Sequence, residues 1–304
     1  MKKAVITGAT GAIGTALIEE LTRRGVAVLA LCRRGGRVGQ LPSHPLLSVC
    51  YCDLADLASI STRESDYDVF YHLAWAGTSG NARNDTLLQC NNIRYAIDAV
   101  HAAKRFGCHT FIGAGSQAEY GRFAGALTPK TPTFPENGYG MAKLAAGGLT
   151  RLAAEAAAMR HIWVRILSVY GPHDNENSLI SYTVRGLLRG EALRFTKGEQ
   201  VWDLLYSHDA ARALALLGDR GKHGAVYPLG SGEARPLREY LLTARDTIAP
   251  HVPLDFGALP YAPDAVMHLE ADISTLTADT DWLPTTDFTS GILKTAQWWK
   301  THGI

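Results

Sequence analysis

The sequence predicts an α/β protein built on a doubly wound parallel sheet, with a smaller C-terminal lobe interleaved with it. Over the first 115 residues, short runs of β-type residues alternate with amphipathic segments long enough to form helices. A glycine-rich turn directly follows the first of these runs, and the alternation loosens only beyond Gly171. Strands separated by helices need crossover connections, which are right-handed and make neighbouring strands parallel.

Strands are expected where short runs rich in β-branched and aromatic residues are bounded by turn-forming residues. They lie at Ala4–Thr7, Val26–Leu31, Leu47–Tyr51, Val69–Leu73, Thr110–Gly113 and Ile162–Val169. Helices are expected where apolar residues recur at helical spacing, as Ile13, Leu17 and Leu21 do. They lie at Ala12–Arg24, Thr86–Phe106, Met141–Met159 and near Leu179–Leu188.

The length of 304 residues allows one large domain or two interleaved ones. We expect residues 1–170 to form the larger domain, with part of residues 201–227 returning to it. Residues 171–304 are expected to form the smaller lobe, because the strand–helix alternation is less regular there.

The composition excludes several classes of protein. Hydrophobic residues make up 46% and charged residues 19%, which is typical of a globular chain rather than a disordered one. Thirty Lys and Arg against 29 Asp and Glu leave a net charge of +1, so no overall field favours nucleic acid or an anionic membrane. The N-terminal apolar run is too short for a signal peptide and no run is long enough to span a membrane, which predicts a cytoplasmic protein.

Five cysteines form no metal-ligand pattern. Cys50 and Cys52 would share one face of a strand, but no second pair stands at metal-ligand spacing. We therefore expect free, mostly buried thiols, no disulfide framework and no metal site.

The turn after the first strand reads Gly8-Ala9-Thr10-Gly11-Ala12-Ile13-Gly14 and opens a helix. Glycines in this context let the backbone approach a pyrophosphate, which free N–H groups and the helix dipole attract. The pattern predicts a dinucleotide site in a Rossmann-type sheet. Its expected cofactor-binding residues are Gly8, Thr10, Gly11, Ala12, Ile13 and Gly14.

The end of the second strand indicates which dinucleotide is bound. An acidic residue there would accept the ribose hydroxyls of NAD, but this chain has Cys32 followed by Arg33, Arg34 and, further on, Arg37. Guanidinium groups suit a 2′-phosphate, so NADP(H) is favoured, while NAD(H) stays possible. The alternative is that Arg33 and Arg34 only solvate an exposed turn.

Further cofactor contacts are expected at the ends of later strands. Asp53 and Leu54 lie where an adenine would bind, although Asp53 also suits an N-cap. Leu73, Ala74 and Trp75 belong to a segment in which small residues allow close backbone approach, and they follow His72, which we interpret as a packed strand histidine. Asn92, in the next helix, either bridges backbone groups near the site or is an ordinary polar residue.

The chemical centre is predicted at Tyr139 and Lys143, which lie four residues apart on one face of a helix. A nearby cation stabilises a phenolate, which makes Tyr139 a candidate proton donor to a carbonyl. Ser116, at the end of the preceding strand, supplies a hydroxyl that could polarise the same oxygen.

These motifs resemble those of an extended short-chain dehydrogenase/reductase of the sugar-nucleotide epimerase/dehydratase type. Later segments extend the resemblance over nearly the whole chain: Arg165–Pro172, Trp202–Asp209, Leu229–Gly232 and Asp272–Ser274 followed by Trp282 and Trp298. The resemblance implies that Tyr139 is the acid–base, that Lys143 holds the nicotinamide ribose and lowers the pKa of the tyrosine, and that Ser116 orients the substrate oxygen. It also implies a homodimer formed through the helices at 86–106 and 141–159, although their small residues would equally suit packing on the chain's own sheet.

Departures from the family pattern reduce the number of reactions and substrates that the resemblance implies. Family members that eliminate water carry an Asp-Glu pair after the catalytic hydroxyl, where this chain has Gln117 and Ala118, so a dehydratase is not expected. Trp202 stands where many relatives have an arginine that grips a nucleotide diphosphate, and Ser168 stands where many have Asn. Trp202 either stacks on a base or sugar, or packs within the lobe.

The favoured function is an NADPH-dependent reductase of a 4-keto, 6-deoxy sugar nucleotide. The alternative is an NAD(P)-dependent sugar-nucleotide epimerase, and a protein that senses NADP(H) without turnover is the least favoured. The expected substrate-binding residues, placed by analogy, are Thr78, Ser79, Asn175, Leu179, Trp202, Asp203 and Tyr206. The pair His208-Asp209 is interpreted as structural.

Overall fold

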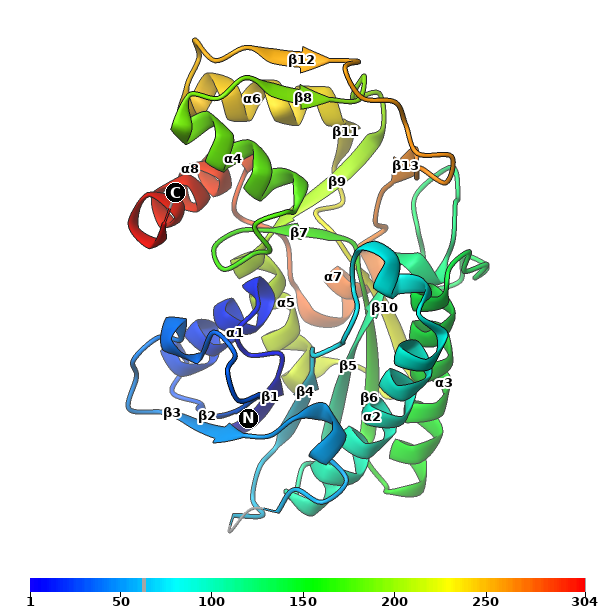
Figure 1. The fold of residues 1–304 in the computed structure, drawn as a ribbon. Helices are drawn as coiled ribbons and strands as arrows, with labels where there is room; N and C mark the ends of the chain where they lie inside the picture. The colour runs from blue at the N-terminus through cyan, green and yellow to red at the C-terminus, as the bar shows by residue number, and fades with distance from the viewer. Residues whose placement is uncertain (62–63, 304) are drawn as a thin grey trace.

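A computed structural model describes residues 1–61 and 64–303 of the chain. Its centre is a seven-stranded sheet in the order β10-β6-β5-β4-β1-β2-β3, and every neighbouring pair is parallel (Figure 1). The strands are β1 (Lys3–Thr7), β2 (Ala27–Cys32), β3 (Leu47–Tyr51), β4 (Val69–His72), β5 (Thr110–Ser116), β6 (Arg160–Ile166) and β10 (Ala225–Leu229). The predicted fold class is confirmed. The strand order reverses between β1 and β4, which is where sheets of this kind bind ligands.

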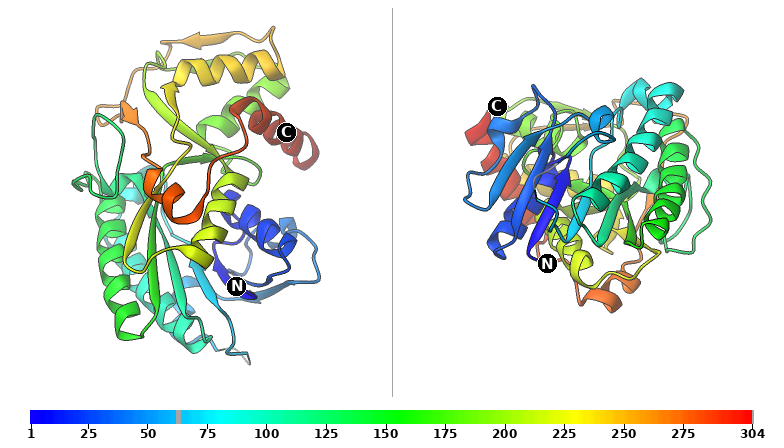
Figure 2. Two further views of the ribbon diagram at one scale, coloured as in Figure 1. Left: turned by 180° about the vertical axis from the view of Figure 1, so that it is seen from behind. Right: turned by 90° about the horizontal axis from the view of Figure 1, so that it is seen from below.

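Helices cover both faces of the sheet (Figures 1 and 2). On one face, α1 (Ala12–Arg23) and α5 (Ser207–Arg220) share a core with the strands, in which Leu17, Ile112 and Leu214 are fully buried. On the other face, α2 (Thr86–Arg105) and α3 (Gly138–Ala156) cover Phe70 and Phe111. Burial on both faces explains why the strands read as continuous apolar runs.

The smaller lobe lies beyond the carboxyl ends of the central strands (Figure 1). Its main sheet joins β9 (Val201–Tyr206) to β7 (Ser168–Tyr170), β11 (Ala234–Pro236) and β13 (His268–Leu269), and a small sheet pairs β8 (Leu193–Phe195) with β12 (Leu254–Phe256). The helices α4 (Leu179–Arg189), α6 (Leu237–Ile248) and α8 (Phe288–His302) pack together around a second core. Short 3₁₀ segments are η1 (Val38–Gln40), η2 (Leu54–Asp56), η3 (Gly80–Asn84) and η4 (Gln117–Glu119).

Two sequence predictions need correction. The single strand expected at Ile162–Val169 is wrong, because the chain leaves the central sheet at Leu167 and its next three residues pair with β9 as β7. The long helix begins at Gly138 rather than Met141, because the Asn137 side chain accepts a hydrogen bond from the Gly140 N–H and caps it.

The chain passes between the two parts more than once. After β9 it returns through α5 and β10 to the central sheet. It returns again at α7 (Ser274–Thr280) and the residues that follow, where Leu276 and Trp282 are buried in the same core as Leu17. The larger core therefore receives residues from both halves of the sequence.

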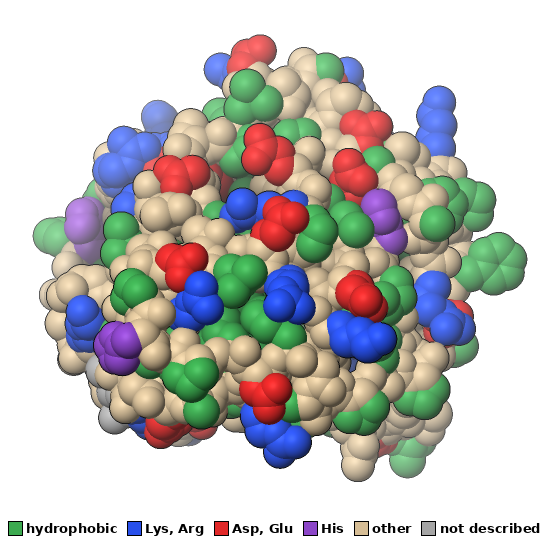
Figure 3. Space-filling view, turned by 90° about the horizontal axis from the view of Figure 1, so that it is seen from above, with side chains coloured by type: hydrophobic (Ala, Val, Ile, Leu, Met, Phe, Trp, Pro, Cys, Tyr) green, Lys and Arg blue, Asp and Glu red, His purple; other side chains and the backbone are tan. Residues whose placement is uncertain are grey.

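The surface carries charges of both signs. Figure 3 shows Lys and Arg side chains interspersed with Asp and Glu over the face seen from above, in keeping with the small net charge. Within the described residues, no helix is long and apolar enough to cross a membrane.

Candidate active site

A cavity of about 760 Å³ lies at the carboxyl ends of β1, β2 and β4. One wall is the glycine-rich turn, a second is formed by the residues that follow β2 and η2, and a third is formed by the segment that follows β4. The lining residues that the sequence predicted for a cofactor are Gly8, Thr10, Gly11, Ala12, Arg33, Asp53, Leu54, Leu73, Ala74 and Trp75. The volume suits a mononucleotide or dinucleotide ligand.

The glycine-rich turn is shaped by close backbone packing. Gly8 has a positive φ of 73°, and a Cβ atom on it would lie 2.7 Å from the Ala74 backbone nitrogen. A Cβ on Gly14 would collide with the Gly8 carbonyl oxygen. These contacts require glycine at both positions and keep the start of α1 open toward the cavity. Gly14 is buried and Ile13 packs against the core, so these two residues support the turn but do not line the cavity.

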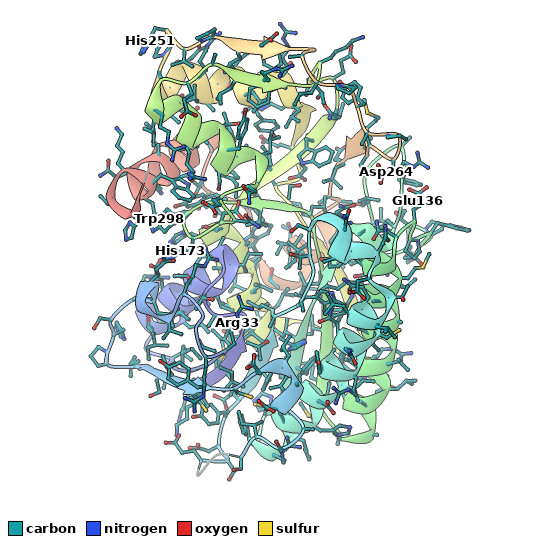
Figure 4. The ribbon with its side chains drawn as sticks, in the orientation of Figure 1. Arg33, Glu136, His173, His251, Asp264 and Trp298 are labelled. Atoms are coloured by element: carbon teal, nitrogen blue, oxygen red, sulfur yellow. The ribbon has the colours of Figure 1, made fainter. Side chains whose placement is uncertain are left out.

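Arginines line the end of the cavity next to β2. Arg33 and Arg37 both face it, and Figure 4 shows Arg33 beside the ends of the central strands. Arg34 does not contribute to this lining; its guanidinium lies 5.5 Å from the Tyr51 ring centroid. The two arginines that line the cavity are therefore Arg33 and Arg37, and Arg34 is not one of them. Asp53 is the N-cap residue of η2, but its side chain makes no capping hydrogen bond and lines the cavity instead.

The opposite wall comes from a loop that was not predicted to contact a cofactor. His173, Asp174 and Asn175 follow β7 and line the same cavity as Arg33. Burial raises the pKa of Asp174, and Arg37 is among the groups that lower it, so Arg37 lies near this loop. Asn175 was expected to bind substrate, but the structure places it at this cavity.

The segment after β4 is held by two amide side chains of α2. Asn92 accepts a hydrogen bond from the Ala76 N–H at 3.1 Å and donates one to the Ala76 carbonyl at 2.8 Å. It therefore bridges two backbone groups, which is the first of the two alternatives expected for it. Gln89 donates to the Gly77 carbonyl and accepts from the Trp75 indole N–H, both at 2.9 Å. Asn92 thus holds the backbone of Ala76, which lines the cavity, but Asn92 itself does not line it.

Tyr139 lies next to Trp75. The Tyr139 ring packs edge-on against the Trp75 indole, with 6.2 Å between ring centroids. Burial raises the pKa of Tyr139, while Ser116 and the Arg83 guanidinium lower it. Trp75 also lines the cavity, so Tyr139 contacts a residue of the cavity wall.

Lys143 is buried next to the same indole. Its ammonium group lies 3.9 Å from the Trp75 ring centroid and donates to the Ala114 carbonyl at 2.5 Å, and the residue is only 3% exposed. Burial lowers the pKa of Lys143 to about 7, against a smaller raising effect of Glu119. Tyr139 and Lys143 do share one helix face, with the ammonium 5.8 Å from the phenol ring centroid.

A buried carboxylate holds Ser116 in place. Glu119 has no exposed surface and accepts hydrogen bonds from the Ser116 N–H at 2.7 Å, the Trp163 indole N–H at 3.0 Å and the Arg165 guanidinium at 2.7 Å. Three donors and one opposite charge compensate for removing this carboxylate from water. The sequence pattern Ser-x-x-Glu, which often forms a capping box, is the signal that could have identified Glu119.

His72 is a packed strand histidine, as predicted. It is 3% exposed, its Nδ1 lies 3.0 Å from the Thr7 hydroxyl, and its ring stacks on Phe111. Burial, together with the Lys143 charge, lowers the pKa of His72 to about 3, so the ring is neutral at physiological pH.

Two of the residues expected to contact substrate are buried in this structure. Asp203 is fully buried and accepts hydrogen bonds from Ser231, Gly232 and Ala271, so it ties β9 to two loops. Tyr206 is 3% exposed and stacks on His208. The sequence could not reveal this, because alternation along β9 does not say which face is covered.

The remaining expected substrate contacts are accessible. Thr78 is exposed and lines the cavity, and Ser79 is exposed beside it. Leu179 is 36% exposed at the start of α4. The Trp202 indole is partly buried and donates to the Ser168 hydroxyl at 2.7 Å, so it packs within the lobe in this structure.

The chain is similar to known proteins over most of its length. A family model described as the NAD dependent epimerase/dehydratase family matches residues 4–230. The chain is 25% identical over 331 aligned residues to a dTDP-glucose 4,6-dehydratase of Neisseria gonorrhoeae, covering 98% of this chain and 95% of that protein.

Solved structures share the fold. A UDP-N-acetylglucosamine 4-epimerase from Methanobrevibacter ruminantium M1, in complex with UDP-N-acetylmuramic acid, superposes with a TM-score of 0.89 at 24% identity and 99% coverage of both chains. A UDP-glucuronic acid 4-epimerase from Bacillus cereus, in complex with UDP-glucuronic acid and NAD, superposes with a TM-score of 0.86 at 22% identity, covering 98% of this chain and 99% of that one.

Proposed function

Because the chain belongs to the NAD-dependent epimerase/dehydratase family, we propose that it is an NADPH-dependent reductase of a 4-keto, 6-deoxy sugar nucleotide. Family membership, which the sequence motifs indicated, makes the chain an enzyme of the extended short-chain dehydrogenase/reductase type. The cofactor's phosphate form, the direction of the reaction and the roles of individual residues are our proposals.

The observation that carries the proposal is the pair Arg33 and Arg37 at the β2 end of the cavity. Two guanidinium groups suit the 2′-phosphate of NADP(H), and the residue that ends β2, Cys32, is not a carboxylate that would favour the free ribose of NAD. A reductase needs a reduced cofactor that is replaced after each turnover, and NADPH meets that need.

The cavity fits a pyridine dinucleotide. The backbone of Gly8 to Ala12 would hold the pyrophosphate, because Gly8 and Gly14 leave no room for a Cβ and the start of α1 faces the cavity. Asp53 and Leu54 would contact the adenine, and Leu73 to Trp75 would contact the nicotinamide half. When bound, the reduced nicotinamide supplies a hydride.

The residues beyond Trp75 would complete the reduction. Tyr139 would donate its proton to the carbonyl oxygen of the substrate as the hydride reaches the carbonyl carbon, which leaves an alcohol. Ser116, whose side chain lowers the pKa of Tyr139, would donate to the same oxygen and orient it. Glu119 would keep Ser116 in place through the Ser116 N–H.

Two residues after Ser116 argue against water elimination. Gln117 and Ala118 occupy η4, and neither has a group that titrates. Dehydration of a sugar needs an additional acid and base, which an amide and a methyl group cannot supply. We therefore do not propose dehydration, although curated relatives include dehydratases.

The second candidate is a sugar-nucleotide epimerase. It is favoured by the two superposed structures, both described as 4-epimerases, one of them with NAD. The same Tyr139 and Ser116 would serve, first removing and later returning a proton at one hydroxyl oxygen. An epimerase would keep its cofactor between turnovers and show no net redox change.

We propose that the sugar nucleotide binds between the two parts of the molecule, beside Thr78, Ser79 and Leu179. Stacking of the Trp202 ring on the ligand belongs to the same proposal, because the hydrogen bond with Ser168 uses only the indole N–H. The division into a cofactor-binding domain at 1–170, with part of 201–227 returning to it, and an interleaved substrate lobe at 171–304 is part of the same proposal.

A homodimer is proposed through α2 and α3. Both helices lie on the outside of the sheet, and α3 exposes Met141 by 54%, Leu149 by 44% and Leu152 by 54%, while α2 exposes Leu87 by 77%. The exposed α3 residues recur at helical spacing and form one stripe, which would be covered by the same stripe of a second copy.

The test is a cofactor oxidation assay with purified protein. We expect loss of NADPH absorbance with at least one of the CDP-, dTDP-, UDP- or GDP-linked 4-keto-6-deoxy sugars. Tyr139→Phe should abolish turnover and keep NADPH binding, whereas a sensor would show no turnover to lose.

Arg33→Ser should raise the KM for NADPH about tenfold and leave that for NADH nearly unchanged, since it removes charge-assisted bonds to one phosphate. Arg34→Ser is the matched control and should leave both values near wild type. Inactivity with all four ketose classes, together with tightly copurifying cofactor and epimer interconversion, would favour the epimerase instead.

A further inference from the structure

One guanidinium group of the smaller lobe rests on aromatic rings and has no carboxylate to balance its charge. Arg235 lies in β11, and its guanidinium carbon is 4.0 Å from the centroid of the Tyr240 ring and 5.5 Å from that of Phe288. No carboxylate of the described residues forms an ion pair with it. An aromatic face attracts a cation but leaves N–H donors at the edge of the guanidinium free. Arg235 can therefore still bind an anion.

The rings under Arg235 are fixed within the lobe. Tyr240 belongs to α6, is 4% exposed, and donates its hydroxyl proton to the Glu233 carbonyl at 3.2 Å. Its ring packs edge-on against Phe288, with 4.8 Å between ring centroids. A planar guanidinium that already rests on a fixed surface loses less conformational freedom when it binds a ligand.

Arg235 is also the cross-strand neighbour of Trp202. β11 and β9 are antiparallel, and Arg235 pairs with Trp202 in their register. Residues directly opposite each other in an antiparallel pair carry their side chains on the same face, with Cβ atoms about 5 Å apart. Both residues are partly exposed. The face that carries the Trp202 indole therefore also carries the Arg235 guanidinium.

The carboxylate next to Trp202 along β9 is directed to the other face. Successive residues of a strand alternate between the two faces, and Asp203 follows Trp202. Asp203 is fully buried and accepts hydrogen bonds from Ser231, Gly232 and Ala271. Its charge is thus used to hold these loops and does not pair with Arg235.

This face of the sheet belongs to the part of the smaller lobe that meets the central sheet. Figure 1 shows β7 and β9 next to the carboxyl ends of the central strands. The Trp202 indole N–H donates to the Ser168 hydroxyl of β7 at 2.7 Å, which fixes the orientation of the ring. Trp202 therefore connects β7, at the gap where the sugar nucleotide is proposed to bind, with the strand pair that carries Arg235.

We propose that Arg235 binds the diphosphate of a sugar nucleotide whose base or sugar stacks on Trp202. The proposal rests on the proposed function for the class of substrate, because a sugar nucleotide carries two phosphate groups. A planar guanidinium forms bidentate, charge-assisted hydrogen bonds with phosphate oxygens. Arg235 does not line the cofactor cavity, so this anion site is separate from the one at Arg33 and Arg37.

The experiment measures the binding of nucleoside diphosphates to the full-length protein by isothermal titration calorimetry. CDP, dTDP, UDP and GDP are titrated separately, and the ligand that binds most tightly is used for the variants. Arg235→Gln should weaken its binding about tenfold to a hundredfold and leave NADPH binding unchanged, because charge-assisted bonds to phosphate are lost. Arg235→Lys, which keeps the charge but not the planar set of donors, should weaken it by less.

Salt dependence and a control variant separate a lost charge from a disturbed lobe. The affinity of the wild type for the diphosphate should fall more steeply with ionic strength than that of Arg235→Gln. Arg238→Gln is the matched control, because the Arg238 guanidinium also lies on an aromatic ring, 4.3 Å from the Phe256 centroid, but Arg238 does not pair with Trp202. It should bind the diphosphate as the wild type does. Should Arg235→Gln fail to fold, Arg235→Met, which keeps an apolar stem on the Tyr240 ring, takes its place.

A folded Arg235 variant that binds the diphosphate as tightly as the wild type would overturn the proposal. So would an equal loss in Arg238→Gln, or a wild type that binds none of the four nucleoside diphosphates. Because the readout needs no turnover, a failed reductase assay together with an affinity that depends on Arg235 would reject the proposed reaction and leave this site supported. NADPH-dependent turnover of a ketose nucleotide with an unchanged KM in Arg235→Gln would support the reaction and reject the site.

Discussion

Lys143 should destabilise the folded protein near neutral pH, and replacing it should reveal this. The side chain is 3% exposed, and its ammonium has one hydrogen bond, to Ala114, and the face of the Trp75 ring. Burial lowers its pKa from 10.5 to about 7. We therefore expect Lys143→Met, which keeps the length and removes the charge, to be more stable than wild type at pH 7 while losing turnover.

The pH dependence gives the magnitude. Since the folded-state pKa lies below the unfolded value, the unfolded chain binds more protons between pH 7 and 10.5, and the stability contributed by this site rises with pH across that window. The gap between the two pKa values corresponds to about 4–5 kcal/mol. From pH 7 to 9.5, wild type should gain about 3 kcal/mol relative to Lys143→Met.

The assay is urea unfolding of both proteins at pH 7, 8.25 and 9.5, compared as the difference between them at each pH. The hydrogen bond to Ala114 that methionine cannot make costs about 1 kcal/mol at every pH and therefore does not affect the slope. Lys104→Met, on the exposed end of α2, is the control and should show a difference independent of pH in this range. A difference between wild type and Lys143→Met that stays constant with pH would refute the reasoning.

Three other variants test separate parts of the structure. Asp203→Asn should lower the free energy of unfolding by about 2–4 kcal/mol, measured by thermal or urea denaturation, because an amide cannot accept all the hydrogen bonds that the buried carboxylate accepts. Trp75→Phe should remove most of the change in tryptophan fluorescence on NADPH binding, since Trp75 lines the cavity; an undiminished change would place the cofactor elsewhere. The double substitution Leu149→Glu and Leu152→Glu should convert a dimer to monomers in analytical ultracentrifugation, and a wild type that is already monomeric would contradict the proposed interface.

Much of the larger domain could be predicted from local sequence. The first five strands and the first two helices lie within a few residues of their expected positions, because each is specified by a short apolar period and bounded by turn residues. The glycine-rich turn was predictable for the same reason, since Gly8 and Gly14 act through backbone contacts only a few residues apart or with the adjacent strand. The split of 162–169 into β6 and β7 was not predictable, because the apolar run continues while its partner strand changes.

The candidate site, too, was predictable only where it depends on residues close together in the sequence. Four-residue spacing along one helix is enough to place Tyr139 and Lys143 on one face, and a strand end is enough to place Ser116 at the carboxyl edge of the sheet. Only the tertiary structure decided that Arg33 and Arg37 line the cavity while Arg34 lies on Tyr51, that Asp203 is buried, and that Lys143 contacts Trp75, a residue of the cavity wall.

The sequence alone therefore determined the fold class, the glycine-rich turn and the placement of Tyr139 and Lys143 on one helix face, since these depend on residues that are neighbours along the chain. The tertiary structure decided the electrostatics around that pair. Arg83, Glu119 and Lys143 come from three different segments, and the charge each presents to Tyr139 depends on burial and on distances between those segments. Such distances are set by how the whole chain packs, which no local pattern specifies.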